Sequence, residues 1–242
     1  MKNFRSAIQF MTALPAGRAG EFEAAGMVPW FPAVGLLLGG LLALFDSLVA
    51  RWWGPPTAAV LEVVLLVVMT GAFHLDGLGD TADGLFSHRP KEKMLEIMKD
   101  SRIGAMGVVA ICSVLAVKWA GLSGLRDHRL LLLILVPAYA RCGILLAMRF
   151  LEYGRPGGGM GLPFFGCRLG LRQFWGMAAT LALSIGLGLK AVWLNLGFFL
   201  MAAAIIGYYR WRLGCVTGDM LGAVTEVTEA GLFLLASMGG GR

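Results

Sequence analysis

Seven apolar runs, each close to the length that a helix needs to cross a bilayer, constrain this chain most strongly. Such a helix takes about 17–25 residues, and the runs lie at 28–50, 57–73, 104–122, 129–149, 174–189, 191–207 and 217–238. Hydrophobic residues make up 57% of the 242 residues and charged ones 15%, against about 45–50% and about 25% in a soluble domain. The sequence therefore predicts an all-α, polytopic transmembrane helix bundle of about seven spans, with six to eight allowed, in a single integral membrane domain over residues 1–242.

One stretch leaves the number of spans open. Gly186, Gly188 and Lys190 interrupt the hydrophobic sequence between residues 174 and 207. Glycine there fits either a tight hairpin between two helices or a single kinked helix with a re-entrant piece.

The basic residues predict the orientation, because loops rich in Lys and Arg tend to remain cytoplasmic. The seven-span arrangement puts fourteen of the 21 on one side: Lys2, Arg5, Arg18, Arg89, Lys91, Lys93, Lys99, Arg102, Arg149, Arg155, Arg168, Arg172, Arg210 and Arg212. The other side receives Arg51, Lys118, Arg126, Arg129, Lys190 and Arg242. We therefore expect a multi-pass protein of the cell inner membrane, with its amino terminus and two loops, 74–103 and 150–173, in the cytoplasm.

The net charge of +6 follows from this loop bias and from attraction to anionic lipid. The basic residues form no stripe with interleaved aromatic residues, so the sequence argues against a nucleic-acid partner. Residues 1–15 alternate apolar and polar side chains at helical spacing, which predicts an amphipathic helix in the membrane interface. The lipid bilayer is therefore the expected partner, and a homo-oligomer is left open.

Three aspartates follow the second apolar run, at a place where a bilayer protein rarely gathers carboxylates. In a helix, Asp76, Asp80 and Asp83 would fall at i, i+4 and i+7 and so share one face. Hard oxygen ligands in that arrangement suit Mg²⁺. The alternative for each aspartate alone is a solvated loop charge or a helix cap.

A second acidic group opens the last apolar run, where Asp219, Glu226 and Glu229 progress inward from the membrane edge. Carboxylates at such depth usually line a polar cavity, with a proton or ion pathway as the alternative. Arg141 also falls inside a span, and its partner is either one of these glutamates or a substrate phosphate.

Further candidates flank the aspartates. Lys99, Asp100 and Arg102 mix both signs of charge just before the third run, as expected where basic side chains help to hold a metal-bound phosphate. His74 could serve as a general base, a partner of the acidic group, or a structural histidine. The candidate substrate-binding residues are thus Lys99, Asp100, Arg102, Arg141, Asp219, Glu226 and Glu229.

The glycine-rich stretch from Arg155 to Pro163 is too irregular for regular structure. It would form either a flap over a substrate or a plain connector.

These residues are similar to the signature of the cobalamin synthase family, membrane enzymes that act as adenosylcobinamide-GDP ribazoletransferases. The resemblance spans the chain and is carried by Phe31-Pro32-Ala33-Val34-Gly35, His74-x-Asp76-Gly77-Leu78-x-Asp80-x-x-Asp83-Gly84, Ile97-Met98-Lys99-Asp100-Ser101-Arg102-Ile103-Gly104 and Thr217-Gly218-Asp219-x-Leu221-Gly222-Ala223, with Glu226 and Glu229. Cys215 departs from the pattern, where relatives often have glycine.

The resemblance implies a Mg²⁺-dependent transfer. The ribose 3'-hydroxyl of α-ribazole, or of its 5'-phosphate, would attack the cobinamide-side phosphorus of adenosylcobinamide-GDP and expel GMP. The implied roles are metal binding by Asp76, Asp80 and Asp83, completed or bridged by Asp100 or Asp219; pyrophosphate binding by Lys99 and Arg102; and a general base that is an aspartate or His74.

Two other functions remain as alternatives. A CDP-alcohol-type phosphotransferase also places Asp-x-x-Asp-Gly at a membrane helix end, but here Leu85-Phe86-Ser87-His88 follows in place of that family's x-x-Ala-Arg. An ion-coupled transporter would instead use the deep charges of Arg141, Asp219, Glu226 and Glu229.

Overall fold

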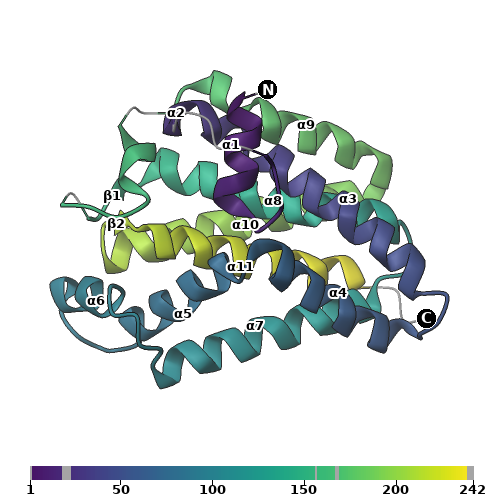
Figure 1. Cartoon of the computed structure of the whole chain (residues 1–242), viewed down its shortest axis with the longest axis horizontal. Helices are drawn as coiled ribbons and strands as arrows, with labels where there is room; N and C mark the ends of the chain where they lie inside the picture. The colour runs from purple at the N-terminus through teal and green to yellow at the C-terminus, as the bar shows by residue number, and fades with distance from the viewer. Residues whose placement is uncertain (1, 18–22, 156, 167–168, 239–242) are drawn as a thin grey trace.

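Helices dominate the computed structural model, which describes residues 2–17, 23–155, 157–166 and 169–238 (Figure 1). Its elements in chain order are α1 (Lys2–Met11), α2 (Ala24–Met27), η1 (Val28–Trp30), α3 (Phe31–Val49), α4 (Pro55–Thr70), α5 (Phe73–Leu85), α6 (Lys91–Ile97), α7 (Ala105–Gly124), α8 (Arg129–Phe150), β1 (Glu152–Tyr153), η2 (Leu162–Phe165), η3 (Leu171–Phe174), α9 (Trp175–Ser184), η4 (Ile185–Leu187), α10 (Leu189–Arg212), β2 (Cys215–Val216) and α11 (Gly218–Ser237). Arg18, Arg168 and Arg242 from the charge count lie outside the described residues.

The predicted all-α membrane bundle is confirmed, but with fewer spans than seven. Within the described residues, five helical segments are long and apolar enough to cross a membrane: Ala24–Val49, α7, α8, α10 and α11. The bent pair α4 and α5 makes a sixth if it counts as one span. The run at 174–189 yields only the 10-residue α9 and one 3₁₀ turn, and α9 at about 1.5 Å per residue is too short for the hydrocarbon core.

The stretch between residues 174 and 207 forms a hairpin. Gly188 takes φ +60° between η4 and α10, a conformation that favours glycine. The side chain of Asn195 donates to the hydroxyl of Ser184 at 3.1 Å. Residues eleven apart in one continuous helix would be about 16 Å apart, so this bond requires the chain to turn back.

A sharp bend joins α4 to α5, and much of the segment 74–103, predicted to connect two spans, is helical. Gly71 and Ala72 both take left-handed backbone angles, and the two helices meet at 91°. Residues 73–85 and 91–97 are helical as a result. The glycines of α5 allow this helix to pack closely against its neighbours, as Gly77 does against Asp219 and Gly84 against Met98.

Close backbone contact holds the centre of the bundle together. A Cβ atom on Gly35 of α3 would lie 2.5 Å from the Cα atom of Ala138 in α8, and Gly39 meets Ile134 in the same way. Because lipid is as apolar as the side chains, such packing is a main source of helix association in a membrane.

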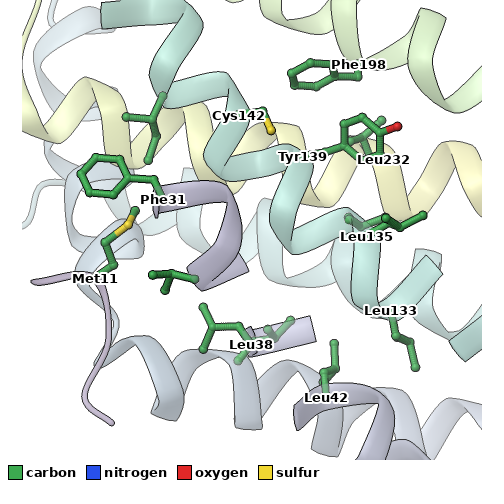
Figure 2. Close-up of a cluster of buried hydrophobic side chains, with 14 of the residues drawn as sticks. Met11, Phe31, Leu38, Leu42, Leu133, Leu135, Tyr139, Cys142, Phe198 and Leu232 are labelled. Atoms are coloured by element: carbon green, nitrogen blue, oxygen red, sulfur yellow. The ribbon is translucent and has the colours of Figure 1, made fainter. Parts of the chain in front are cut away.

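The largest hydrophobic core surrounds α8. Figure 2 shows part of it, where Leu38 of α3, Leu133 and Tyr139 of α8, Phe198 of α10 and Leu232 of α11 gather. The outward faces of α7 and α10 stay apolar, as a lipid-facing surface requires, and only 22% of the apolar window of each helix is buried. The protein is therefore a multi-pass membrane protein.

Two small features complete the fold. Helix α1 forms as its periodicity predicts and lies across the bundle (Figure 1), with Ala7 and Met11 buried in the main core. Part of its apolar face therefore packs on protein. Strands β1 and β2 pair in parallel, with Glu152 opposite Cys215 and Tyr153 opposite Val216. This pairing fastens the segment after α8 to the start of α11.

We expect Gly35→Ala to destabilise the bundle, because its new methyl group would overlap the backbone of α8. Overpacking of this kind costs about 1–3 kcal/mol. The matched control is Gly40→Ala in the same helix, since a Cβ atom at Gly40 meets nothing within 4 Å. Thermal unfolding of the detergent-solubilised protein should show a lower midpoint for Gly35→Ala alone, and equal midpoints would contradict the α3–α8 contact.

Candidate active site

One end of the bundle collects the acidic residues, and we call it the aspartate end: the end where α5 finishes and α11 begins. Figure 1 shows α5, α6 and the β1–β2 pair gathered there. Asp76, Asp80 and Asp83 all lie in α5, and Asp219 lies in the first turn of α11. The predicted grouping of distant carboxylates thus has a structural basis.

Two glycines set the spacing between α5 and α11. A Cβ atom on Gly77 would lie 2.7 Å from the carbonyl oxygen of Asp219, and one on Gly222 would lie 3.0 Å from that of His74. The helices therefore touch backbone to backbone. At this separation Asp80 interacts electrostatically with the carboxylates of Asp76, Asp219 and Asp83.

A cavity of about 300 Å³ opens beside this contact. Its lining comes from α1, α3, α5, α8, α11 and the segment after β1, and comprises Phe10, Met11, Phe31, Phe73, His74, Asp76, Gly77, Ile144, Met148, Tyr153, Arg155, Gly159, Met160, Gly161, Phe164, Gly218, Asp219, Leu221 and Gly222. The cavity therefore has a charged side, where α5 meets α11, and a largely aromatic side, formed by α1, α3 and η2.

Arg155 faces Asp219 across this cavity, with 2.7 Å between the guanidinium and a carboxylate oxygen. The parallel register explains the pairing, because Gly154 donates its backbone N–H to Val216 just before α11 begins. The guanidinium Nε has no hydrogen-bond partner among the described residues. A mostly buried arginine with spare donors is well suited to bind a phosphate.

The glycine-rich stretch after Arg155 forms part of the cavity wall. Gly159 and Gly161 pack against the ring of Tyr153, where a Cβ atom on Gly161 would come within 2.8 Å. Gly159 also has φ +107°, which strongly favours glycine. Burial raises the pKa of Tyr153, so its phenol remains protonated near neutral pH.

His74 lies in the cavity wall with only 2% of its surface exposed. Neither ring nitrogen has a hydrogen-bond partner among the described residues. Buried polar groups are nearly always paired, so an unpaired one calls for an explanation. An imidazole that borders a cavity with free nitrogens can take a proton from a bound ligand.

Asp83 has a different environment from the other aspartates of α5. Its carboxylate accepts the backbone N–H groups of Gly104 at 2.6 Å and Gly107 at 2.8 Å. It therefore stabilises the N-terminus of α7, where a negative charge is favourable. Asp83 thus fits the alternative of a helix cap better than the predicted role of a metal ligand.

Lys99, Asp100 and Arg102 are outside the cavity lining. The carboxylate of Asp100 pairs with the guanidinium of Arg102 at 2.6 Å, and these hydrogen bonds hold the pKa of Asp100 at about 2. Both side chains are largely solvated, 40% and 87% exposed. The structure thus does not bring Asp100 together with Asp76 and Asp219.

A buried charge network lies deeper in the bundle. The ammonium of Lys118 is 2.7 Å from both Glu226 and Glu229, and Arg141 pairs with Glu229. This answers the question of the Arg141 partner in favour of an ion pair. It also corrects the placement of Lys118 in an outer loop, because this residue is 3% exposed within α7. His74 interacts electrostatically with Arg141, Glu229 and Lys118 and so borders the network.

The residues that line the cavity fit a magnesium ion by their chemistry. Asp76 and Asp219 contribute hard oxygen atoms, Asp80 adds a third carboxyl group nearby, and Arg155 pairs only with Asp219. Within the part of the chain that the structure describes, no three acidic, His or Cys side chains come close enough to hold a metal by themselves. Mg²⁺ is commonly bound by one or two carboxylates together with substrate phosphates.

Sequence reasoning missed Arg155 and the aromatic side chains of the cavity lining as parts of the site. Arg155 was counted as a basic loop residue and as the first residue of the glycine-rich stretch, a flap or a connector, but it was not assigned to a substrate. Its place two residues before a run of glycines was an available signal. The sequence contains no such signal for Phe10 and Tyr153. Their places in the cavity lining depend on contacts of α1, η2 and β1 with segments that are distant in sequence.

The apolar helices and the charged cavity at one end of the bundle place this chain among the polytopic membrane proteins with an acidic site. The family model for cobalamin-5-phosphate synthase matches residues 3–237, so the chain belongs to this family. No solved structure matches it.

Curated relatives agree with that assignment. The chain is similar to proteins named adenosylcobinamide-GDP ribazoletransferase. That of Escherichia coli is 39% identical over 97% of this chain and 98% of its own length. That of Clostridium novyi is 37% identical over 98% of this chain and 96% of its own length. That of Acetivibrio thermocellus is 36% identical over 84% of this chain and 83% of its own length.

We expect Lys118→Met to destabilise the protein strongly, because it leaves Glu226 and Glu229 buried with one cation fewer. Removing one partner of a buried ion pair costs about 3–5 kcal/mol. The control is Lys93→Met, which breaks an exposed pair with Glu96 worth about 0–1 kcal/mol. Thermal unfolding in detergent measures the stability of both variants. Similar midpoints for the two would contradict a buried ion-pair network around Lys118.

Proposed function

We propose that this chain is an adenosylcobinamide-GDP ribazoletransferase. The ribose 3'-hydroxyl oxygen of α-ribazole, or of its 5'-phosphate, forms a bond to the cobinamide-side phosphorus of adenosylcobinamide-GDP. The bond from that phosphorus to the oxygen of GMP breaks, and the hydroxyl proton passes to a base. The product is adenosylcobalamin or its 5'-phosphate. The observation that carries the proposal is one cavity that combines Asp76, Asp219, Arg155 and His74 in a member of this family.

Arg155 is the residue that we assign to the pyrophosphate. Its guanidinium reaches the cavity and has donors in the fork geometry that phosphate oxygens accept. The start of α11 supports the same role, because Gly218 lines the cavity and unpaired N–H groups at a helix N-terminus favour anions. Lys99 and Arg102 lie outside the cavity lining, and Arg102 is paired with Asp100, so we do not assign them to the pyrophosphate as the resemblance implied.

His74 is our candidate for the general base. His74 lines the cavity together with Asp76, and neither of its ring nitrogens has a hydrogen-bond partner among the described residues, so it can accept the hydroxyl proton without first breaking a hydrogen bond. The network of Lys118, Glu226, Glu229 and Arg141 holds α7, α8 and α11 around it. We therefore treat Arg141, Glu226 and Glu229 as positioning residues, in place of the substrate contacts expected from sequence.

Mg²⁺ is the cofactor that we propose, held by Asp76 and Asp219 with Asp80 close by. When bound, it would offset the negative charge of the phosphate oxygens that changes during the transfer. Asp83 and Asp100 are already engaged by α7 and by Arg102, so we do not assign them to the metal.

We also propose that the aspartate end faces the cytoplasm of a cell with this protein in its inner membrane. The support is the basic residues near that end, such as Arg89, Lys91 and Lys93 between α5 and α7, and the positive-inside tendency of such segments. The nucleotide substrate would then reach the cavity from the aqueous side.

The direct test is release of GMP by purified protein in detergent or nanodiscs, supplied with adenosylcobinamide-GDP and α-ribazole. We expect GMP only when both substrates and Mg²⁺ are present, and none after chelation with EDTA. Asp76→Asn should lower the rate by about 100-fold or more, as expected for a group that stabilises the transition state. The matched control is Asp127→Asn, a solvated residue between α7 and α8.

Several results would contradict the proposal. GMP release that persists in EDTA would contradict the proposed requirement for Mg²⁺. A near-normal rate for Asp76→Asn would contradict the assignment of this cavity as the active site. Absence of GMP under every condition, from protein that unfolds cooperatively, would exclude the transferase activity itself.

A further inference from the structure

Four phenylalanines from four separate segments meet at the apolar side of the cavity. Phe10 comes from α1, Phe31 from α3, Phe73 from α5 and Phe164 from η2. The ring centroids of Phe10 and Phe164 are 4.8 Å apart, and those of Phe10 and Phe73 are 5.6 Å apart in an edge-on arrangement. Phe10 thus stands at the centre of an aromatic wall, which we define as these four rings.

The aromatic wall adjoins open space on one side. All four rings line the cavity of about 300 Å³, with Met11, Ile144 and Met148 as further apolar neighbours. Figure 2 shows one of these rings, Phe31, beside the side chain of Met11. Aromatic side chains prefer offset or edge-on contact with other flat rings, so a space bordered by them fits a flat aromatic ligand.

We infer that the aromatic wall holds the benzimidazole base of α-ribazole, which makes the cavity the site of the acceptor substrate. This inference rests on the proposed function. The base is flat and carries methyl groups, which match phenylalanine and methionine side chains. Its ribose would then extend toward His74 and Asp76, and the 3'-hydroxyl would reach the charged side of the cavity.

Size and polarity argue against the other candidates for this space. The volume is at the lower end of about 300–1,000 Å³ for small-molecule sites, and the corrin ring of the donor substrate is much larger than a nucleoside. Guanine has polar groups around its edge, and a buried edge of that kind needs hydrogen-bond partners. Phe10, Phe31, Phe73 and Phe164 offer none from their side chains.

The inference gives the N-terminal helix a function. Phe10 and Met11 are at the end of α1, and Ala13 donates its backbone N–H to the carbonyl of Met69 near the α4–α5 bend. The same connection holds Phe10 next to Phe73. Helix α1 therefore closes the acceptor site, in addition to any contact with the membrane surface.

The test uses Phe10→Leu in the full-length protein, because leucine keeps the apolar volume and removes the ring. The control is Phe199→Leu on α10, an exposed ring that lies outside the cavity lining. We expect Phe10→Leu to raise the KM for α-ribazole about tenfold, in line with the loss of an aromatic contact. The KM for adenosylcobinamide-GDP should stay within about twofold, and Phe199→Leu should change neither value.

Direct binding separates this inference from the proposed function. Equilibrium dialysis with labelled α-ribazole measures binding without turnover, with dimethylbenzimidazole and ribose 5-phosphate as competitors. Competition by the free base, and weaker binding by Phe10→Leu, would support the acceptor site even if no GMP formed. Unchanged binding by Phe10→Leu, or a rise only in the KM for adenosylcobinamide-GDP, would overturn it while the transferase activity stood.

Discussion

The contact between α5 and α11 determines what the rest of this molecule can do. Gly77 lies against the backbone of Asp219, and Gly222 lies against that of His74. Larger side chains at these positions would separate the helices and with them the carboxylates that they carry. The carboxylates of Asp76, Asp80 and Asp219, kept this close, repel one another unless cations or protons neutralise them. The helix packing therefore favours the binding of a cation at this place, because Arg155 pairs with only one of the carboxylates.

The buried network and the aromatic wall support this contact from two sides. Buried ion pairs among Lys118, Glu226, Glu229 and Arg141 join α7, α8 and α11. On the other side, α1 closes the cavity with Phe10. The ion-coupled transport alternative depended on those deep charges, and their mutual pairing gives them a structural role. A donor phosphate and an acceptor base can then be placed at opposite sides of one small space.

Much of this could be predicted from sequence, because the hydrophobic runs and the aspartate spacing are local signals. The membrane bundle and the helical face of Asp76 and Asp80 followed from them. Lys118 could not be placed, since a lysine near the end of an apolar run reads as a loop residue until its partners on α11 are known. Arg155 and Phe10 were missed for a similar reason, as their roles depend on the β1–β2 pair and on contacts of α1.

Metal binding measured by electron paramagnetic resonance tests the central claim most directly, with Mn²⁺ as a probe for Mg²⁺. If α5 and α11 share one site, the purified protein should bind Mn²⁺. Asp76→Asn and Asp219→Asn should each weaken binding by about tenfold or more, and Asp127→Asn should leave it unchanged. Full-affinity binding by either cavity variant would show that the two helices do not form a common site.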